Sequence, residues 1–333
     1  DRHFETVRFL YPFPDYKTPS CVLTEEMLTR VDPSEMIGSF PSVDHGDRRR
    51  RPLFDEGLAW KELAANGMVP AMANSFLALA TKGTDAGLQL DSLGRLYSQD
   101  RRPEFATVTR FLGDEDGAVS VAKTRTAGGT ELVEGSLRHR EWSGPWHEGV
   151  SLHYTMTRRM RSRDLDLAGM LEPSRAWFED LRRSANGSSV PGDRLDSNWR
   201  NCYVVGDSVE YIDQEWEWTE PLPLRLVVAR VLYDFVFALL DARSLSPLIQ
   251  RWRVDQFLVA AAHEYGVSLD QAALREFASF EAAFLSQVRG GPPVTADDVT
   301  AVLRRRLEPR GAQVLGSLPR RGVRWVERRV ARR

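Results

Sequence analysis

Polar and hydrophobic positions alternate through much of the first half of the chain, a pattern typical of β-strands. The alternation continues on both sides of the sequence GDEDG, whose Asp-Gly step favours a tight turn, and predicts a hairpin over residues 104–126. Two more strands are expected within 4–24, around a loop with three prolines, and others over 71–81 and 149–157. A threonine cap predicts one short helix over 130–140. The first half is therefore expected to be mainly β.

The second half is patterned mainly as helices, because its apolar residues recur every three to four positions. A polar, Arg-rich segment within residues 43–70 is expected to be a linker. Together the two halves predict an α+β chain of two domains. The predicted helices cover 171–184, 222–242, 245–265, 269–289 and 296–307, and two short strands are predicted at 202–205 and 209–212.

Composition indicates a folded, water-facing chain, with 42% hydrophobic and 28% charged residues. Cys21 and Cys202 lie too far apart in sequence to indicate a disulfide framework or a zinc spacing, so a reducing, cytoplasmic setting is expected. No histidines are spaced as a metal-binding pair. The chain begins at Asp1 without a signal pattern, and we interpret it as part of a longer protein.

The C-terminal segment 291–333 is strongly basic: from Arg304 to Arg333 there are eleven arginines against Glu308 and Glu327. The sequence RRGVRWVERRVARR places apolar residues among arginines, which predicts a basic amphipathic helix on an anionic membrane surface. The alternative is a solvated helix whose apolar side covers a neighbouring domain. No nucleic-acid partner is expected, because the basic block has no accompanying recognition fold.

The segment LDSNWRNCYVVGDSVEYIDQEWEW holds the residues with the clearest chemistry. Phosphoryl transfer of the protein-kinase type needs an Asp for the attacking hydroxyl, an Asn and an Asp for Mg²⁺, and a lysine on a strand for the phosphates of ATP. Asp196, Asn201, Asp213 and Lys123 occur in the order that these roles require. Glu134 or its neighbour Glu131, on the predicted helix that follows, could pair with the lysine.

Each of these residues also has a simpler interpretation. Asp196 and Asn201 could form a turn in a surface loop, since Asp and Asn side chains readily bond to nearby main chain. Asp213 could form a structural ion pair with an arginine. Lys123 could be an exposed strand residue, and an acidic residue such as Glu134 is more often solvated.

This segment resembles the catalytic loop and metal-binding strand of the aminoglycoside-phosphotransferase-like and choline-kinase-like branch of the kinase fold. The shared pattern is Asp, four residues, Asn, then Ile-Asp with an acidic and aromatic continuation. The resemblance implies a bilobal domain over 71–290, with a small β-rich lobe and a helical lobe, that binds ATP and Mg²⁺. The His that often precedes the catalytic Asp is absent, as is a glycine-rich phosphate loop.

The sequence FETVRFLYPFPDYKTPSCVLTEEML is similar to the last strands of a class I S-adenosylmethionine-dependent methyltransferase, in bacterial proteins where that domain precedes a kinase-like region. The best-known relatives of this type are the O-antigen chain-terminating methyltransferase-kinase enzymes. The resemblance implies that residues 1–42 are a Rossmann-like remnant and that the S-adenosylmethionine site lies upstream of this chain.

Both resemblances lead to one functional expectation. The chain is expected to transfer a phosphoryl group to a hydroxyl of a saccharide or lipid-linked glycan, in surface-polysaccharide biosynthesis at the inner face of the membrane, with a glycosyltransferase as a partner. The alternative is a kinase-like scaffold that has lost its chemistry and serves the methyltransferase.

Overall fold

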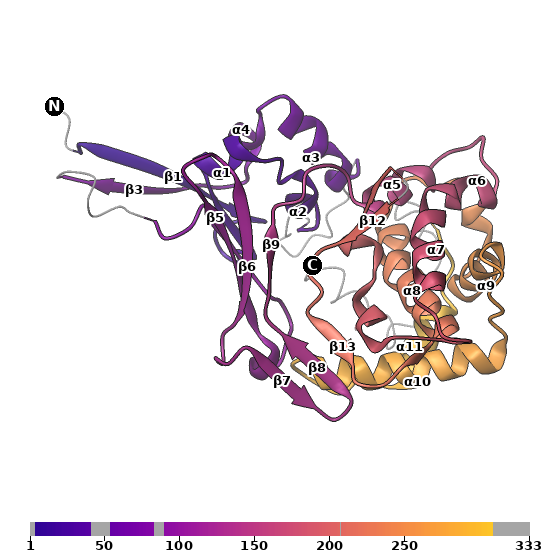
Figure 1. Ribbon diagram of the computed structural model, residues 1–333. Coiled ribbons are helices and arrows are strands. Elements are labelled where there is room, and N and C mark those ends of the chain that lie inside the picture. Colours follow the sequence, from indigo (N-terminus) through magenta and orange to yellow (C-terminus); the bar gives the residue numbers. More distant parts are fainter. Residues whose placement is uncertain (1–3, 41–53, 83–89, 207, 309–333) are drawn as a thin grey trace. The chain divides into compact units, whose positions relative to one another are not determined.

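A computed structural model describes residues 4–40, 54–82, 90–206 and 208–308 (Figure 1). The chain folds as two compact units. Among the described residues, unit 1 contains those up to Thr130 and the segment Glu141–Glu148, while unit 2 contains Glu131–Arg140 and the residues from Gly149 to Glu308. Both units mix helices with antiparallel strands, so the expected α+β class is confirmed.

In the described part of unit 1, seven strands form one antiparallel sheet in the order β3-β1-β2-β4-β5-β6-β9. The strands are β1 (Thr6–Phe13), β2 (Cys21–Thr24), β3 (Leu77–Thr81), β4 (Gly94–Tyr97), β5 (Thr107–Gly113), β6 (Val119–Arg125) and β9 (Trp142–Pro145). The helices are α1 (Glu25–Arg30), α2 (Ser34–Gly38), α3 (Glu56–Ala65), α4 (Val69–Met72) and the 3-10 turn η2 (Pro103–Phe105).

The hairpin of β5 and β6 forms as its alternating pattern predicts. Asp114 accepts a hydrogen bond from the Ala118 amide at 2.8 Å, and Gly117 takes a φ of 91°, a left-handed conformation that costs glycine little. The register pairs Phe111 with Val121 and Thr109 with Lys123. The prediction over 104–126 is confirmed, and Lys123 lies on β6.

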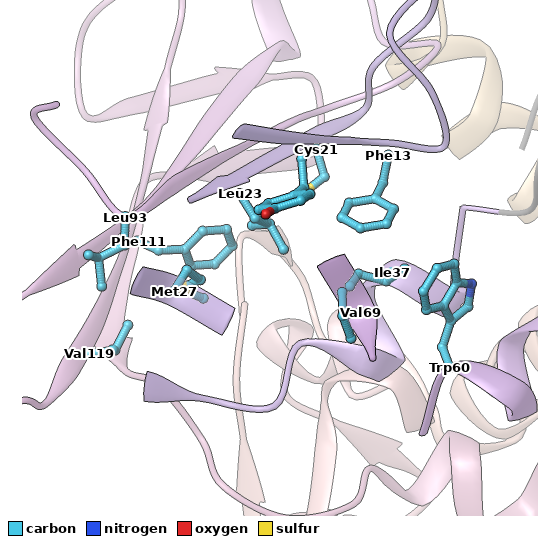
Figure 2. Packing of buried hydrophobic residues seen from close by; sticks show 11 residues of the cluster. Phe13, Cys21, Leu23, Met27, Ile37, Trp60, Val69, Leu93, Phe111 and Val119 are labelled. Carbon is cyan, nitrogen blue, oxygen red and sulfur yellow. The ribbon is translucent and has the colours of Figure 1, made fainter. Parts of the chain in front are cut away.

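The core of unit 1 joins the sheet to helices α1 to α4 (Figure 2). Phe13 and Trp60 meet edge to face, with 5.6 Å between ring centroids, so β1 packs on α3. Such burial of large apolar side chains stabilises by roughly 1.5–3 kcal/mol for each one. The cluster consists of Tyr11, Phe13, Cys21, Leu23, Met27, Ile37, Trp60, Val69, Leu93, Phe111 and Val119.

Unit 2 is mainly helical, with short strands that carry the candidate site. Its helices are α5 (Leu152–Arg159), α6 (Leu167–Leu171), α7 (Arg175–Arg183), α8 (Leu224–Asp241), α9 (Val254–Glu264), α10 (Gln271–Val288) and α11 (Ala296–Leu303), with 3-10 turns η3 (Glu172–Ser174), η4 (Gly192–Asp196), η5 (Trp199–Asn201) and η6 (Ile249–Arg251). Its strands are β7 (Glu131–Glu134), β8 (Leu137–Arg140), β10 (Ser189–Val190), β11 (Cys202–Val205), β12 (Ser208–Tyr211), β13 (Trp216–Trp218) and β14 (Leu222–Pro223).

Helix α8 is the central helix of unit 2, because most of its residues are apolar and twelve of its eighteen are buried. Helices α9 and α10 pack against it. Helix α10 begins at its cap Asp270, whose side chain accepts from the Ala273 amide at 2.7 Å. The predicted helices at 222–242 and 269–289 and the strands at 202–205 and 209–212 are confirmed to within two residues.

Two predicted elements are wrong. Residues 130–140 form the hairpin β7–β8 in place of a helix, because Gly135 adopts a φ of 60° and β8 also pairs with the distant strand β13. Residues 149–157 contain helix α5 in place of a strand. Ser151 caps α5 by accepting from the Tyr154 amide at 3.1 Å, and Leu152 and Met156 are buried one turn apart.

The units differ from the predicted domain boundaries. Strands β1 and β2, expected as a separate remnant over 1–42, belong to the same sheet as the hairpin β5–β6. The expected linker over 43–70 contains α3 and the start of α4, and both contribute to the core. Helix α11 lies within the predicted tail segment, whereas residues 309–333 lie outside the described residues. No helix formed by the described residues is long and apolar enough to cross a membrane.

Candidate functional site

The loop that carries Asp196 and Asn201 consists of two short 3-10 turns, η4 and η5. Gly192 starts the loop against β13, so closely that a Cβ at this position would lie 1.7 Å from the carbonyl oxygen of Trp218. Trp177 of α7 is fully buried and donates its indole N–H to the carbonyl oxygen of Ser197 at 2.8 Å. Contacts from β13 and α7 to the main chain of the loop therefore hold it in place.

Asp196 is buried, with 5% of its surface exposed, and both of its carboxylate oxygens accept hydrogen bonds. Oδ1 accepts from Nδ2 of Asn198 at 3.1 Å, and Oδ2 accepts from the main-chain amide of Glu215 at 3.1 Å. The second donor lies nineteen residues further along the chain. Asp196 is thus held by a long-range contact, which differs from the alternative of a simple turn in a surface loop.

Asn201 connects the two aspartates through its side-chain amide. Its Nδ2 donates to the carbonyl oxygens of Asp196 and Asp213, each at a long 3.4 Å, and its own carbonyl accepts from the Ile212 amide at 2.9 Å. The side-chain oxygen Oδ1, which is the atom that could coordinate a cation, takes no part in the bonds to Asp196 and Asp213. Asp196, Asn201 and Asp213 are therefore brought together at one place in unit 2.

Asp213 has a left-handed main chain, with a φ of 55°. This conformation costs most side chains about 1–2 kcal/mol, and Asp and Asn adopt it more readily than other residues. Its carbonyl oxygen accepts from the Glu215 amide at 2.9 Å, so the same N–H serves both Asp213 and Asp196. A strained residue next to a convergent polar group is a common feature of functional sites.

Lys123 belongs to unit 1, whereas Asp196, Asn201 and Asp213 belong to unit 2. Its side chain is 7% exposed, on the face of β6 that also carries Val119 and Val121. The alternative of an exposed strand residue is therefore wrong. Lysine is seldom buried unless it is paired, which is consistent with a specific role for this side chain.

Glu134 and Glu131 lie on strand β7 of unit 2 and not on a helix. The carbonyl oxygen of Glu134 accepts a hydrogen bond from Gln287 of α10, and Glu131 lies 3.6 Å from the Arg138 guanidinium. The predicted helix is therefore wrong, whereas the pairing of one of these glutamates with Lys123 stays a prediction.

Several residues that sequence reasoning did not select support the site. His139 and Glu215 form a buried pair, and Arg230 of α8 donates to the carbonyl oxygen of Leu195 at 2.6 Å, directly before Asp196. Glu215 lies in the motif itself, directly before β13, and could have been selected as an acidic residue beside two tryptophans. His139 and Arg230 are distant from the motif in sequence. The only signal for Arg230 is a charged residue within the apolar repeat of α8, and His139 has no comparable signal.

The hairpin β11–β12 next to Asn201 is anchored to α7. Tyr211 donates to Asp180 at 3.0 Å, and Arg194 donates to the same carboxylate at 3.2 Å. Burial raises the pKa of Tyr211 far above its ordinary value, so the phenol stays protonated and remains a donor. Burial, with a smaller contribution from the charge of Asp180, also raises the pKa of Cys202 to about 12, so this thiol is unreactive at neutral pH.

The donor atoms at the site suit Mg²⁺, which prefers oxygen ligands from one or two carboxylates together with phosphate oxygens. The carboxylate of Asp213 and the amide oxygen of Asn201 are of that type. Among the residues that the structure describes, no group of three or more His, Cys, Asp and Glu side chains is placed to hold a metal ion. The candidate set has two carboxylates and one amide, so a cation here would take its remaining ligands from water or from the phosphates of a nucleotide.

No family model, no curated protein and no solved structure matches this chain.

Proposed function

We propose that this chain is a kinase-like phosphotransferase that uses ATP and Mg²⁺. The observation that carries the proposal is the Asn201 side chain, whose amide contacts the main chain of both Asp196 and Asp213. These bonds bring the three residues together, and their order along the chain is the one that kinase-type phosphoryl transfer requires.

In this proposal each residue has one role. Asp196 accepts the proton of the attacking hydroxyl or orients it, and its two hydrogen-bond donors keep the carboxylate in a fixed orientation. Asn201 and Asp213 hold Mg²⁺, which neutralises phosphate charge when bound. Lys123, from the strand β6 of unit 1, contacts the phosphates of ATP. The pairing of Glu134 with Lys123 stays a prediction.

The acceptor class rests on the sequence resemblance. It is a hydroxyl of a saccharide or lipid-linked glycan, within a larger methyltransferase-kinase protein of surface-polysaccharide biosynthesis that works beside a glycosyltransferase. The bilobal kinase-like arrangement and the upstream S-adenosylmethionine site are part of the same proposal. Association with an anionic membrane through the basic C-terminal segment 291–333 also belongs to it.

The proposal is tested by thermal unfolding with ATP, with and without Mg²⁺. A ligand at a hundred times its Kd stabilises a folded protein by about 2.7 kcal/mol, which is readily measured. Asp213→Asn should abolish the Mg²⁺-dependent part, because Asn tolerates the left-handed backbone but lacks the charge. Asp193→Asn, an exposed neighbour in η4, is the matched control and should behave as the parent. Equal stabilisation of Asp213→Asn and parent would refute the metal assignment.

A second candidate function is a kinase-like scaffold without phosphoryl transfer. The observation in its favour is strand β4, which occupies the region before the hairpin where a glycine-rich phosphate loop would be expected. This strand pairs with β2 on one side and β5 on the other. In this case neither ATP nor Mg²⁺ shifts the unfolding temperature of the parent.

A further inference from the structure

Among the ion pairs of the residues that the structure describes, His139–Glu215 is the most deeply buried one near the candidate site. The imidazole is fully buried, Glu215 is 3% exposed, and Nε2 lies 3.1 Å from Oε2. Burying a carboxylate and an imidazole is costly unless each has a partner, so this pair requires a well-defined geometry.

The ring of His139 is held in place by the sheet. His139 and Trp216 are direct partners in the register of β8 and β13, and their rings stack at 4.3 Å between centroids. Trp216 in turn meets Phe284 of α10 edge to face at 5.8 Å. The imidazole therefore has little freedom to turn away from Glu215.

Strand β8 also contacts the main chain of Glu215. The Arg140 amide donates to the carbonyl oxygen of Glu215 at 3.0 Å, and His139 contacts its carboxylate. These two contacts leave the Glu215 N–H directed at Oδ2 of Asp196 and at the carbonyl oxygen of Asp213. The donor to Asp196 thus belongs to a residue whose side chain and carbonyl are both fixed by β8.

We propose that His139 is a positioning residue for Asp196, acting through Glu215. The pair fixes the peptide whose N–H orients the Asp196 carboxylate. A substitution of His139 on β8 would therefore alter the orientation of Asp196, although the two side chains are not in contact. Its effect on turnover rests on the proposed function, whereas its effect on the Glu215 amide does not. The two parts can therefore be tested separately.

The first measurement is hydrogen exchange of the Glu215 amide in the full chain. His139→Phe keeps a ring that can stack on Trp216 but removes the hydrogen bond, and His139→Gln keeps a side-chain donor. We expect exchange at Glu215 to be at least tenfold faster in His139→Phe, with the amides of α10 unchanged. His139→Gln should return most of the protection.

The second measurement is the hydrolysis of ATP in the presence of Mg²⁺, in the same variants. We expect kcat to fall at least tenfold in His139→Phe with KM for ATP within twofold, because nucleotide contacts are untouched, and His139→Gln should recover most of the loss. Arg138→Gln is the matched control. It breaks the Arg138–Glu217 ion pair, at 3.0 Å, one position along the same two strands, and should leave exchange and kcat as in the parent.

The exchange rate at position 215 tests the positioning role of His139. Parental exchange at Glu215 in His139→Phe would overturn it, as would an equal effect of Arg138→Gln. If His139→Phe fails to fold, the double variant His139→Phe with Glu215→Leu replaces the pair by apolar groups. Faster exchange at position 215 would then support positioning, and parental exchange would overturn it. A parent that neither binds nor hydrolyses ATP would refute the proposed function but leave the exchange result valid.

Discussion

Replacing Arg230 by Met should destabilise unit 2 by about 3 kcal/mol. The guanidinium is 13% exposed, its Nε lies 3.2 Å from Glu281 of α10, and Glu281 is 7% exposed. Removing one partner of a buried ion pair typically costs about 3–5 kcal/mol, because the other charge is left buried. The Nε···Oε2 contact has the distance of an ion pair but not the direction of a hydrogen bond, so we take the lower end of that range.

The assay is calorimetric unfolding of Arg230→Met against the parent. For a domain of 150–250 residues each kcal/mol shifts Tm by about 2–4 °C, so the transition of unit 2 should fall by about 6–12 °C. Arg225→Met is the matched control, because Arg225 and Glu276 join the same helices α8 and α10 at 2.7 Å but are largely exposed. Exposed pairs contribute about 0–1 kcal/mol, so this variant should change Tm little.

A double variant identifies the cause of the loss. Arg230→Met with Glu281→Met removes both charges, and most of the stability should return because no charge stays buried alone. The hydrogen bond to the Leu195 carbonyl stays lost, so the loop before Asp196 should remain loosened and ATP hydrolysis reduced. Additive losses in the double variant, or a loss below about 1 kcal/mol in Arg230→Met, would refute this reasoning.

Three further predictions concern packing, thiols and pH. Gly192→Ala should unfold unit 2 at much lower denaturant than the parent, because a Cβ there meets the backbone of β13 at 1.7 Å. Cys21 and Cys202 are fully buried, one in each unit, so single-cysteine variants should react with a thiol reagent only as their own unit unfolds. Burial acts to raise the pKa of Asp32, but hydrogen bonds and the charge of Lys61 hold it below its ordinary value. The stability it contributes is present above about pH 4 and lost as pH falls further, so Asp32→Asn should be less stable than the parent at pH 7 and approach it in acid.

Local patterns predicted the elements whose pairing is also local. The hairpin over 104–126 needed only alternation and an Asp-Gly turn, and helix α8 needed only a long apolar repeat. Helix α5 was mistaken for a strand, although Leu152, Met156 and Met160 are all buried at helical spacing. The helical spacing is present in the sequence, but the β-branched and aromatic residues between these positions favoured the prediction of a strand.

Long-range pairing was beyond the reach of local patterns. The segment 130–140 becomes a hairpin because Gly135 permits the turn and because β8 pairs with β13, nearly eighty residues later, which no local pattern shows. Likewise β2 pairs with β4, about seventy residues away, and this joins the N-terminal strands to the rest of the sheet. Tertiary contacts override propensity in such cases, and a single sequence carries no record of which strands meet.

The candidate site shows the same division between local and distant information. Asp196, Asn201 and Asp213 lie in one segment and were predicted from it, and the structure places them together. Their supports reach the segment mainly through main-chain atoms: the indole of Trp177 bonds a carbonyl, as does Arg230.

Main-chain acceptors exist at every position, so no residue in the motif signals which distant side chain is required. A chain can therefore keep its three motif residues and lose function through an anchor such as His139 or Arg230. For this reason the motif alone does not distinguish a phosphotransferase from a scaffold, and Mg²⁺-dependent nucleotide binding does.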